Sequence, residues 1–328
     1  MYGLRFDLRA PGGVATMPAL YDAAIGMAEY TESRGAVFCG ISEHHASPDG
    51  YLPAPLLLAS AMAARTTTMQ FMIAAALLPL YDPIKLAEEM TVLDIVSNGR
   101  VSYVLAIGYR PEEYALFGVD WEERGTIAEQ KLEVLLLAVS GEPFEHEGRT
   151  VQLTPGPASP GGIRISWGGG TKVAARRAAR HGLDFLAETD GDRLREAYEA
   201  EARAHGREPG NCMLAAPGSA STVFVAHDVD RAWDELGPYL MHDVLTYGAW
   251  NVGKTGIASI SSARTVEELR AEEGSHRIYG FEEAVDLVRG GGMLPLHPLC
   301  GGLPPELAWK YLEIVADEVM PAAHPSGA

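Results

Sequence analysis

A carboxylate and two imidazoles stand side by side in the stretch ISEHHASPDG, residues 41 to 50. The preceding AVFCGI, residues 36 to 41, predicts a short buried strand. Three chemistries fit Glu43, His44 and His45: a metal site, an acid/base site, or a polar strand end with its own hydrogen bonds. Because side chains alternate along an extended chain, Glu43 and His45 should share one side and His44 the other. That geometry is poor for chelating one metal with two histidines, and no ligand spacing such as HExxH supports one, so we predict no metal.

Acid/base chemistry is the favoured interpretation, with His44 as the group that moves a proton. Imidazole has an unperturbed pKa of about 6.5, so it can both give and take a proton near neutrality. Glu43 and His45 are then expected to be the polar support that fixes the strand end and its loop.

A second candidate site is the stretch IRISWGGGTKVAARRAARHG, residues 163 to 182, which reads as a strand, three glycines, a threonine and a helix. Backbone N–H groups at the start of a helix bind phosphate, and glycine lets an anion approach the main chain closely. The run is neither a Walker loop nor a GxGxxG fingerprint, and a plain tight turn would use the same glycines. The predicted phosphate contacts are Gly168, Gly169, Gly170 and Thr171.

Short apolar strands that alternate with longer amphipathic helices must position these residues. Strands are predicted at about residues 3–8, 36–41, 69–76, 101–107, 163–167, 183–187, 222–226 and 292–297. Eight strands in this rhythm favour an α/β fold of the (β/α)8 TIM barrel type over a doubly wound open sheet. The EHH cluster would then stand at the carboxyl end of a strand, the face on which such barrels build their active sites.

Two segments interrupt the rhythm of what we expect to be one domain over residues 1–328. Residues 140–162 are rich in proline and glycine, and residues 240–276 form a mixed stretch before the last strand. Long connections of this kind are often lids or binding loops, so the second is a possible lid.

Composition excludes several classes of function. The 328 residues carry a formal net charge of -18, which would repel a nucleic acid backbone. The longest apolar run, residues 71–81, contains a proline and is too short for a bilayer span, so we expect no membrane association. Cys39, Cys212 and Cys300 are far apart, which fits a reducing cytoplasm.

These pieces together resemble the bacterial luciferase-like monooxygenase family, which are flavin- or deazaflavin-dependent TIM barrels. The matching residues are EHH (43–45), the long central stretch 74–125, the WGGGT loop (167–171) and the closing stretch 304–321. The resemblance implies a reduced flavin at the carboxyl mouth of the barrel, with its phosphate near the helix that starts at residue 172. It also implies that Ala74 and Ala75 form a non-prolyl cis peptide under the flavin ring, and that the first histidine of EHH is catalytic.

The sequence departs from luciferase at Ala106 and Ile107, where that enzyme has a reactive cysteine and a phosphate-binding arginine. Light emission is therefore not expected, and the phosphate must rely on the glycine loop and Thr171, with Arg124 as a further candidate. Arg110 is expected to be an exposed loop arginine.

The resulting expectation is a cytoplasmic, homodimeric monooxygenase. It would bind FMNH2 supplied by a separate flavin reductase and use O2 to oxygenate a small organic substrate. The alternatives are an F420-dependent hydride-transfer enzyme on the same fold and a non-catalytic flavin-binding protein. Both cofactors present a ring and a nearby phosphate, so the sequence does not separate them.

Overall fold

The eight strands expected from the sequence all form in the computed structural model, which describes residues 1–13, 15–189, 191–216, 218–254 and 256–324. The ladders β1–β12, β10–β12, β3–β4, β4–β7 and β7–β8 are parallel, so the predicted α/β class is confirmed. The eight strands are β1 (Tyr2–Phe6), β2 (Ala36–Ile41), β3 (Gln70–Leu77), β4 (Val101–Ala106), β7 (Arg164–Gly168), β8 (Asp184–Ala187), β10 (Thr222–Ala226) and β12 (Leu294–Leu296).

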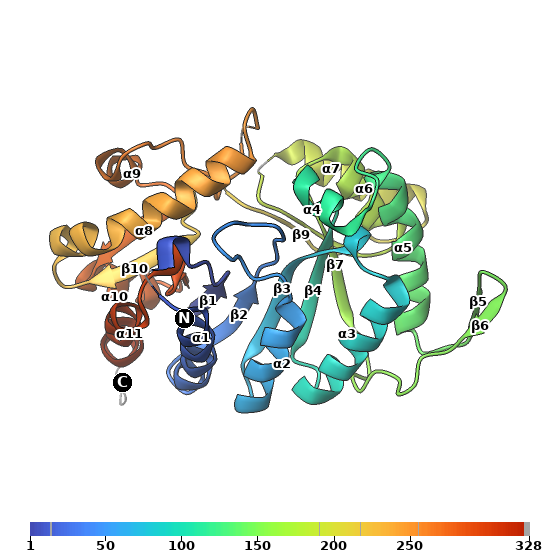
Figure 1. The fold of residues 1–328 in the computed structure, drawn as a ribbon, viewed down its shortest axis with the longest axis horizontal. Helices are drawn as coiled ribbons and strands as arrows, with labels where there is room; N and C mark the ends of the chain where they lie inside the picture. Colours follow the sequence, from blue (N-terminus) through green and yellow to red (C-terminus); the bar gives the residue numbers. More distant parts are fainter. Residues whose placement is uncertain (14, 190, 217, 255, 325–328) are drawn as a thin grey trace. The chain divides into compact units, whose positions relative to one another are not determined.

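The chain divides into two compact units, of which the first comprises Met1–Gly40, Ser47–Leu52 and Ala215–Ala328. Its strands lie in the order β11-β10-β12-β1-β2, with β11 (His276–Gly280) added beside β10 at one edge. The helices of this unit are α1 (Met17–Glu32), α8 (Val229–Trp250), α9 (Val266–Glu272), α10 (Phe281–Arg289), α11 (Pro305–Glu313) and α12 (Met320–Ala323) (Figure 1).

The second unit comprises Ile41–Ala46 and Pro53–Leu214, so it contains the whole EHH cluster and the glycine loop. Its strands lie in the order β3-β4-β7-β8-β9, with β9 (Cys212–Leu214) as an additional edge strand. Its helices are α2 (Pro55–Arg65), α3 (Pro83–Ser97), α4 (Pro111–Phe117), α5 (Arg124–Val139), α6 (Lys172–Arg180) and α7 (Asp192–Ala204) (Figure 1). Trp167, Tyr103 and Phe185 are fully buried in this unit, which fixes the strands that carry the candidate site.

The two interrupting segments have more structure than their composition indicates. Residues 140–162 contain a hairpin of β5 (Phe144–His146) and β6 (Arg149–Val151), in which Phe144 pairs with Val151. The expectation of a long connection from residue 240 is wrong for its first part, because α8 continues to Trp250. Asp243 lies on the buried face of α8 beside Leu240 and Val244. This carboxylate interrupts the helical spacing of apolar residues in the sequence.

The rest of that segment contains α9, and residue 255 lies outside the described residues. Movement of this segment as a lid stays a prediction, as does the single-domain organisation of residues 1–328. Among the helices of the described residues, none combines the length and the apolar character that crossing a membrane requires.

Candidate functional site

The EHH cluster is buried directly after β2. Glu43, His44 and His45 are 2%, 6% and 8% exposed. His45 Nε2 lies 2.7 Å from Glu43 Oε1, whereas His44 Nδ1 lies 2.7 Å from Oε1 of Glu113. The predicted alternation is therefore confirmed, since Glu43 and His45 pair with each other and His44 turns to a different partner.

Helix α4 brings Glu113 to this cluster. Pro111 occupies the first turn of the helix, and Gly118 ends it in the left-handed conformation at φ 65°. Tyr114 anchors the helix, because its ring packs in a buried cluster with Leu77 and Leu80. Glu113 lies in the first turn, where the helix dipole favours a carboxylate.

Glu113 holds three groups together at one oxygen atom. Its Oε1 accepts hydrogen bonds from His44 Nδ1 at 2.7 Å and from the backbone N–H of His45 at 2.9 Å, and Arg110 Nη1 lies 3.5 Å away. Arg110 also donates to the backbone carbonyl of His45 at 2.7 Å. The expectation of an exposed Arg110 is wrong, because this carbonyl and the Glu113 carboxylate bind a guanidinium that is only 5% exposed.

His44 lies in the middle of a hydrogen-bonded chain that runs from Glu113 to Tyr109. The Glu113 carboxylate can only accept, so the hydrogen bond from His44 Nδ1 requires that Nδ1 carry the proton. Nε2 then accepts from the Tyr109 hydroxyl at 3.1 Å. The His44 and Tyr109 rings meet edge to face, with centroids 5.3 Å apart. We refer to these three residues as the Glu113–His44–Tyr109 chain.

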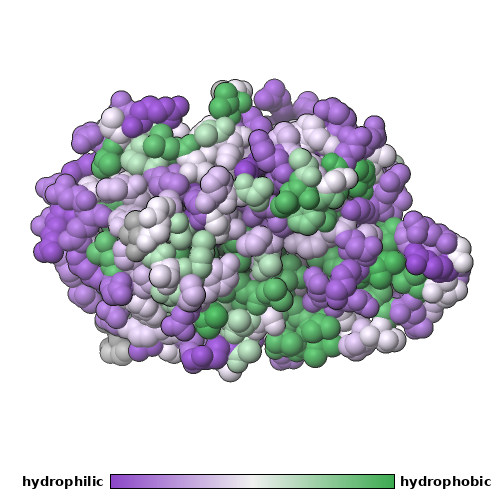
Figure 2. All heavy atoms as spheres, viewed as in Figure 1, coloured by the Kyte–Doolittle hydropathy of each residue, from purple (hydrophilic) through white to green (hydrophobic). Residues whose placement is uncertain are grey.

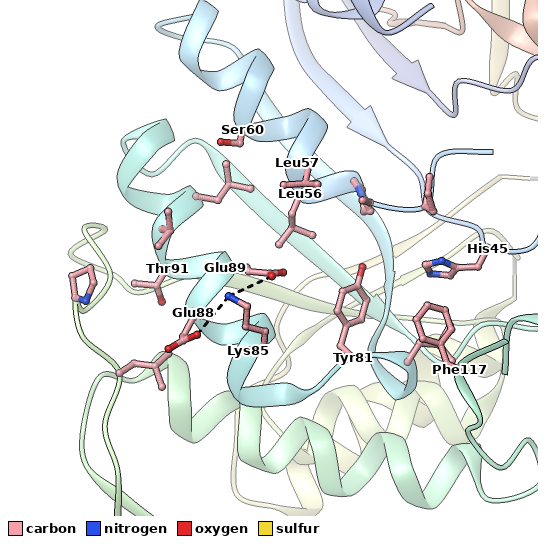
Figure 3. Close-up of a pocket in the computed structure, with 18 of the residues that line it drawn as sticks. His45, Leu56, Leu57, Ser60, Tyr81, Lys85, Glu88, Glu89, Thr91 and Phe117 are labelled. Atoms are coloured by element: carbon pink, nitrogen blue, oxygen red, sulfur yellow. Dashed lines mark ion pairs between the residues drawn. The ribbon is translucent and has the colours of Figure 1, made fainter. Parts of the chain in front are cut away.

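Glu43 and His45 form a separate arm with Tyr81. The Tyr81 hydroxyl donates to Glu43 Oε2 at 2.7 Å, and the Phe117 ring packs edge-on against His45 at 4.8 Å (Figure 3). Burial raises the pKa of Glu43, and burial together with the Glu43 charge raises the pKa of Tyr81 well above its usual range. This arm has the contacts expected of a polar support.

The peptide bond between Ala74 and Ala75 is cis, as predicted. Ala74 pairs with Val104 of β4, and the register shifts between Ala74 and Ala76. On the opposite edge of β4, Trp167 pairs with Leu105 and is followed by Gly168. The cis peptide and the start of the glycine loop therefore flank the carboxyl end of the same strand.

Two of the three glycines of the loop are required by the packing of the protein itself. A Cβ atom on Gly168 would lie 2.9 Å from Val104, and one on Gly169, at φ 143°, would lie 2.9 Å from Ala174. The Gly169 N–H donates to the carbonyl of Leu186 at 3.1 Å. Glycine at these positions is thus explained without an anion, and this N–H already has an acceptor.

Two other features of the loop fit a phosphate. Thr171 is the N-cap of α6 and accepts from the Ala174 N–H at 3.1 Å, which leaves earlier N–H groups of the first turn for an anion. The Thr189 Oγ1 atom is buried and has no hydrogen-bond partner among the described residues. It lies 3.2 Å from the position of a Cβ on Gly170, so an unsatisfied hydroxyl adjoins the loop. Thr189 gave no signal in the sequence.

Arg124 lies at the start of α5 and stacks on Trp121, with the guanidinium carbon 3.9 Å from the ring centroid. Its Nη1 donates to the Trp121 carbonyl at 2.6 Å. Arg177 of α6 donates to the carbonyl of the neighbouring Gly125 at 2.9 Å, which ties α5 to the helix that follows the loop. A phosphate contact by Arg124 stays a prediction.

Two groups of metal-ligand side chains occur in the described part of the chain, and neither includes the EHH cluster: Asp243, His297 and Cys300, and Glu129, Glu133 and His181. Arg9 binds Asp243, and Arg177 binds Glu129 at 2.6 Å. These guanidinium groups already neutralise the carboxylates, which disfavours a cation at either place.

Comparisons with known proteins identify the relatives of this chain. A family model described as luciferase-like monooxygenase matches residues 4–293. An uncharacterised protein of Sinorhizobium fredii is 33% identical over 132 residues, which are 40% of this chain and 38% of that protein. The oxygenase component of the flavin-dependent trigonelline monooxygenase of Acinetobacter baylyi is 28% identical over 147 residues, which are 44% of this chain and 41% of that protein. The matched segments span less than half the length of these two relatives.

Solved structures match over almost the full chain. The oxygenating constituent of 3,6-diketocamphane monooxygenase from Pseudomonas putida, in complex with FMN, matches with a TM-score of 0.73 and 21% identity over 98% of this chain and 97% of that chain. The F420-dependent tetrahydromethanopterin reductase of Methanopyrus kandleri matches with a TM-score of 0.63 and 15% identity over 98% of both chains. At these identities the likeness establishes a shared fold.

Proposed function

Because the chain belongs to the luciferase-like monooxygenase family, we propose that this flavin-dependent oxidoreductase uses FMNH2 and O2 to oxygenate a small organic substrate. The observation that carries the proposal is the buried His44, held between a carboxylate and a phenol. A Cβ on Gly108, just past the end of β4, would lie 3.7 Å from Glu113 Oε2. The Glu113–His44–Tyr109 chain therefore adjoins the end of β4, which the cis peptide also flanks.

Reduced FMN, when bound, supplies the electrons that O2 needs for oxygenation. The first turn of α6, Thr171 and the unsatisfied Thr189 hydroxyl would hold its phosphate, and Ala74 and Ala75 would support its ring. F420 is the alternative cofactor, because it too carries a ring and a phosphate, and the similar structures include an F420-dependent reductase.

His44 exchanges a proton at Nε2 in this account. Glu113 keeps the Nδ1 proton in place and stabilises the imidazolium that forms when Nε2 takes up a proton. The arm of Glu43, His45 and Tyr81 fixes the loop that presents His44. A non-catalytic flavin-binding protein would need no such chain beside its ligand.

We further propose that the protein is a homodimer supplied with FMNH2 by a separate reductase in the cytoplasm. Leu57 of α2 is 75% exposed, and Val92, Ile95 and Val96 of α3 are 51%, 42% and 43% exposed. Figure 2 shows apolar residues gathered over these two helices. A helix face of this kind is typical of a covered surface, and a second copy of the chain would cover it.

A fluorescence titration of the purified protein with FMN and with F420 tests the cofactor assignment. We expect FMN to bind and F420 to bind more weakly. Tight binding of F420 without binding of FMN in either redox state would replace the proposal with the hydride-transfer alternative.

A further inference from the structure

The hydrogen-bonded chain through His44 continues beyond the imidazole, because the Nε2 atom that would exchange a proton faces the hydroxyl of Tyr109. We propose that this hydroxyl, rather than His44 itself, exchanges the proton with the bound ligand, and that Glu113 is a positioning residue behind His44. The inference rests on the proposed function and adds a catalytic residue to it.

Solvent exposure differs between the two ends of the Glu113–His44–Tyr109 chain. Glu113 is 0% exposed and His44 is 6% exposed, whereas Tyr109 is only half-buried. A ligand that approaches from the accessible side reaches the phenol before it reaches the imidazole. Imidazole and phenol are 3.1 Å apart, which is within reach for a proton transfer between heavy atoms.

The loop after β4 sets the position of the phenol. Gly108 has φ 72°, a left-handed conformation in which a Cβ atom would lie 3.4 Å from Leu77. On the other side of Tyr109, Arg110 is held by the His45 carbonyl and by Glu113. Both neighbours of Tyr109 are thus restrained, and the residue that follows binds the same carboxylate that orients His44.

The proton balance of the relay closes without any co-reactant. The relay starts from neutral His44. When the ligand gives a proton, the proton bonds to the Tyr109 oxygen, the phenol O–H proton passes to Nε2, and His44 becomes an imidazolium beside the Glu113 carboxylate. When the ligand then takes a proton, each step reverses, and the Nε2 proton returns to the Tyr109 oxygen. Nδ1 keeps its proton in both directions, so Glu113 changes no bond.

Spectra of the ligand-free protein test the chain independently of activity. In protein labelled with nitrogen-15 at histidine, we expect His44 in the tautomer protonated at Nδ1. Tyr109→Phe should shift the Nε2 resonance and keep the tautomer, whereas Glu113→Gln should produce a mixture of tautomers. An Nε2 resonance that is unchanged by Tyr109→Phe would overturn the relay.

Steady-state O2 uptake with FMNH2 as the probe tests the role of the hydroxyl. Tyr109→Phe and His44→Ala should slow it by the same factor, on the order of 10²- to 10⁴-fold, and the double variant should be no slower than the slower single variant. Tyr198→Phe is the matched control. It removes a phenol hydroxyl from α7 that donates to the carbonyl of Leu183, between α6 and β8, at 2.9 Å.

The outcomes distinguish a failure of the Tyr109 relay from a failure of the proposed acid/base role of His44. If His44→Ala is slow and Tyr109→Phe matches the wild type, the relay is wrong and His44 acts directly. If both variants match the wild type, the acid/base role of His44 in the proposed function is itself wrong.

Discussion

Glu113 Oε1 lies 2.7 Å from Nδ1 of His44, although 69 positions separate the two residues in the chain. The loop after β2 and helix α4, which follows β4, bring them together, and the buried carboxylate has His44, the His45 N–H and Arg110 as neighbours. A single carboxylate thereby fixes both the tautomer of the imidazole and the backbone that carries it.

Glu113→Gln should therefore lower turnover by roughly 10²- to 10⁴-fold while it changes FMN affinity by only a few fold. An amide accepts hydrogen bonds from His44 Nδ1 and the His45 N–H more weakly than a carboxylate does, so the imidazole loses its fixed orientation. Steady-state kinetics and a flavin titration measure the two effects. Glu112→Gln, at the exposed neighbouring position, is the control and should match the wild type. Equal turnover of both variants would contradict the role of Glu113.

Thr189→Val should weaken FMN binding if the Thr189 hydroxyl contacts the phosphate. The loss of one hydrogen bond to a charged group is worth about 1.5 to 3 kcal/mol. Riboflavin has no phosphate, so its affinity should not change, and the difference between the two ligands isolates the contact. Thr150→Val, in the exposed β5–β6 hairpin, is the control. An equal loss for FMN and riboflavin would place Thr189 outside the phosphate site.

A substitution at Gly169 cannot separate the loss of a phosphate contact from strain in the loop. Its φ of 143° and the 2.9 Å approach of a Cβ to Ala174 mean that any side chain strains the loop even without a ligand. We expect Gly169→Ala to lower the free energy of unfolding of the ligand-free protein, measured by chemical denaturation. An unchanged free energy would show that the loop tolerates a side chain there.

Acid should destabilise the first unit through two buried histidines. Burial, together with the charges of Arg5 and Arg9, lowers the pKa of His276 to about 3, and burial and Arg5 lower the pKa of His297 to about 4. In the unfolded chain both would take up protons at about pH 6.5, so the unfolded state binds more protons between about pH 6.5 and 4. The free energy of unfolding should fall through this window as pH decreases, by up to about 1.4 kcal/mol per pH unit for each histidine.

Asp7 acts in a different window. Burial alone would raise the pKa of its carboxyl, but Arg9 and His297 hold it well below the usual range. Its stabilising contribution is present above about pH 4 and is lost only as pH falls further. Denaturation at pH 7, 6 and 5 therefore reports the histidines. His276→Gln should flatten the dependence, and His205→Gln on the exposed end of α7 should not. A wild-type stability that does not change from pH 7 to 5 would contradict this account.

The apolar face of α2 and α3 predicts the oligomeric state. Leu57→Glu combined with Val92→Glu should convert a dimer into a monomer in light scattering, because buried charges without partners are costly at an interface. Leu137→Glu on α5 changes an equally apolar residue, 50% exposed, outside this face and should leave the dimer intact. A wild-type protein that is monomeric at micromolar concentration would exclude the homodimer.

The sequence predicted the strands better than the site. Apolar runs and helical periods are local signals, and each of the eight predicted strands lies within two or three residues of an observed one. The alternation of Glu43, His44 and His45 was also readable, since it depends only on extended backbone. Glu113, Tyr109 and Tyr81 were missed because their contacts with the cluster join residues 38 to 69 positions apart. The stretch GYRPEEY did offer a signal, in polar residues that directly follow a predicted strand and begin a helix.

The central claim is that the protein oxygenates a small organic substrate with O2 and FMNH2. Its most direct test is to incubate the protein and FMNH2 with a metabolite mixture under isotopically heavy O2 and to search for products by mass spectrometry. The account predicts a compound that gains one heavy oxygen atom with the wild type, and far less of it with His44→Ala. A substrate that is oxidised with F420 in the absence of O2, and that gains no oxygen from the gas, would contradict it.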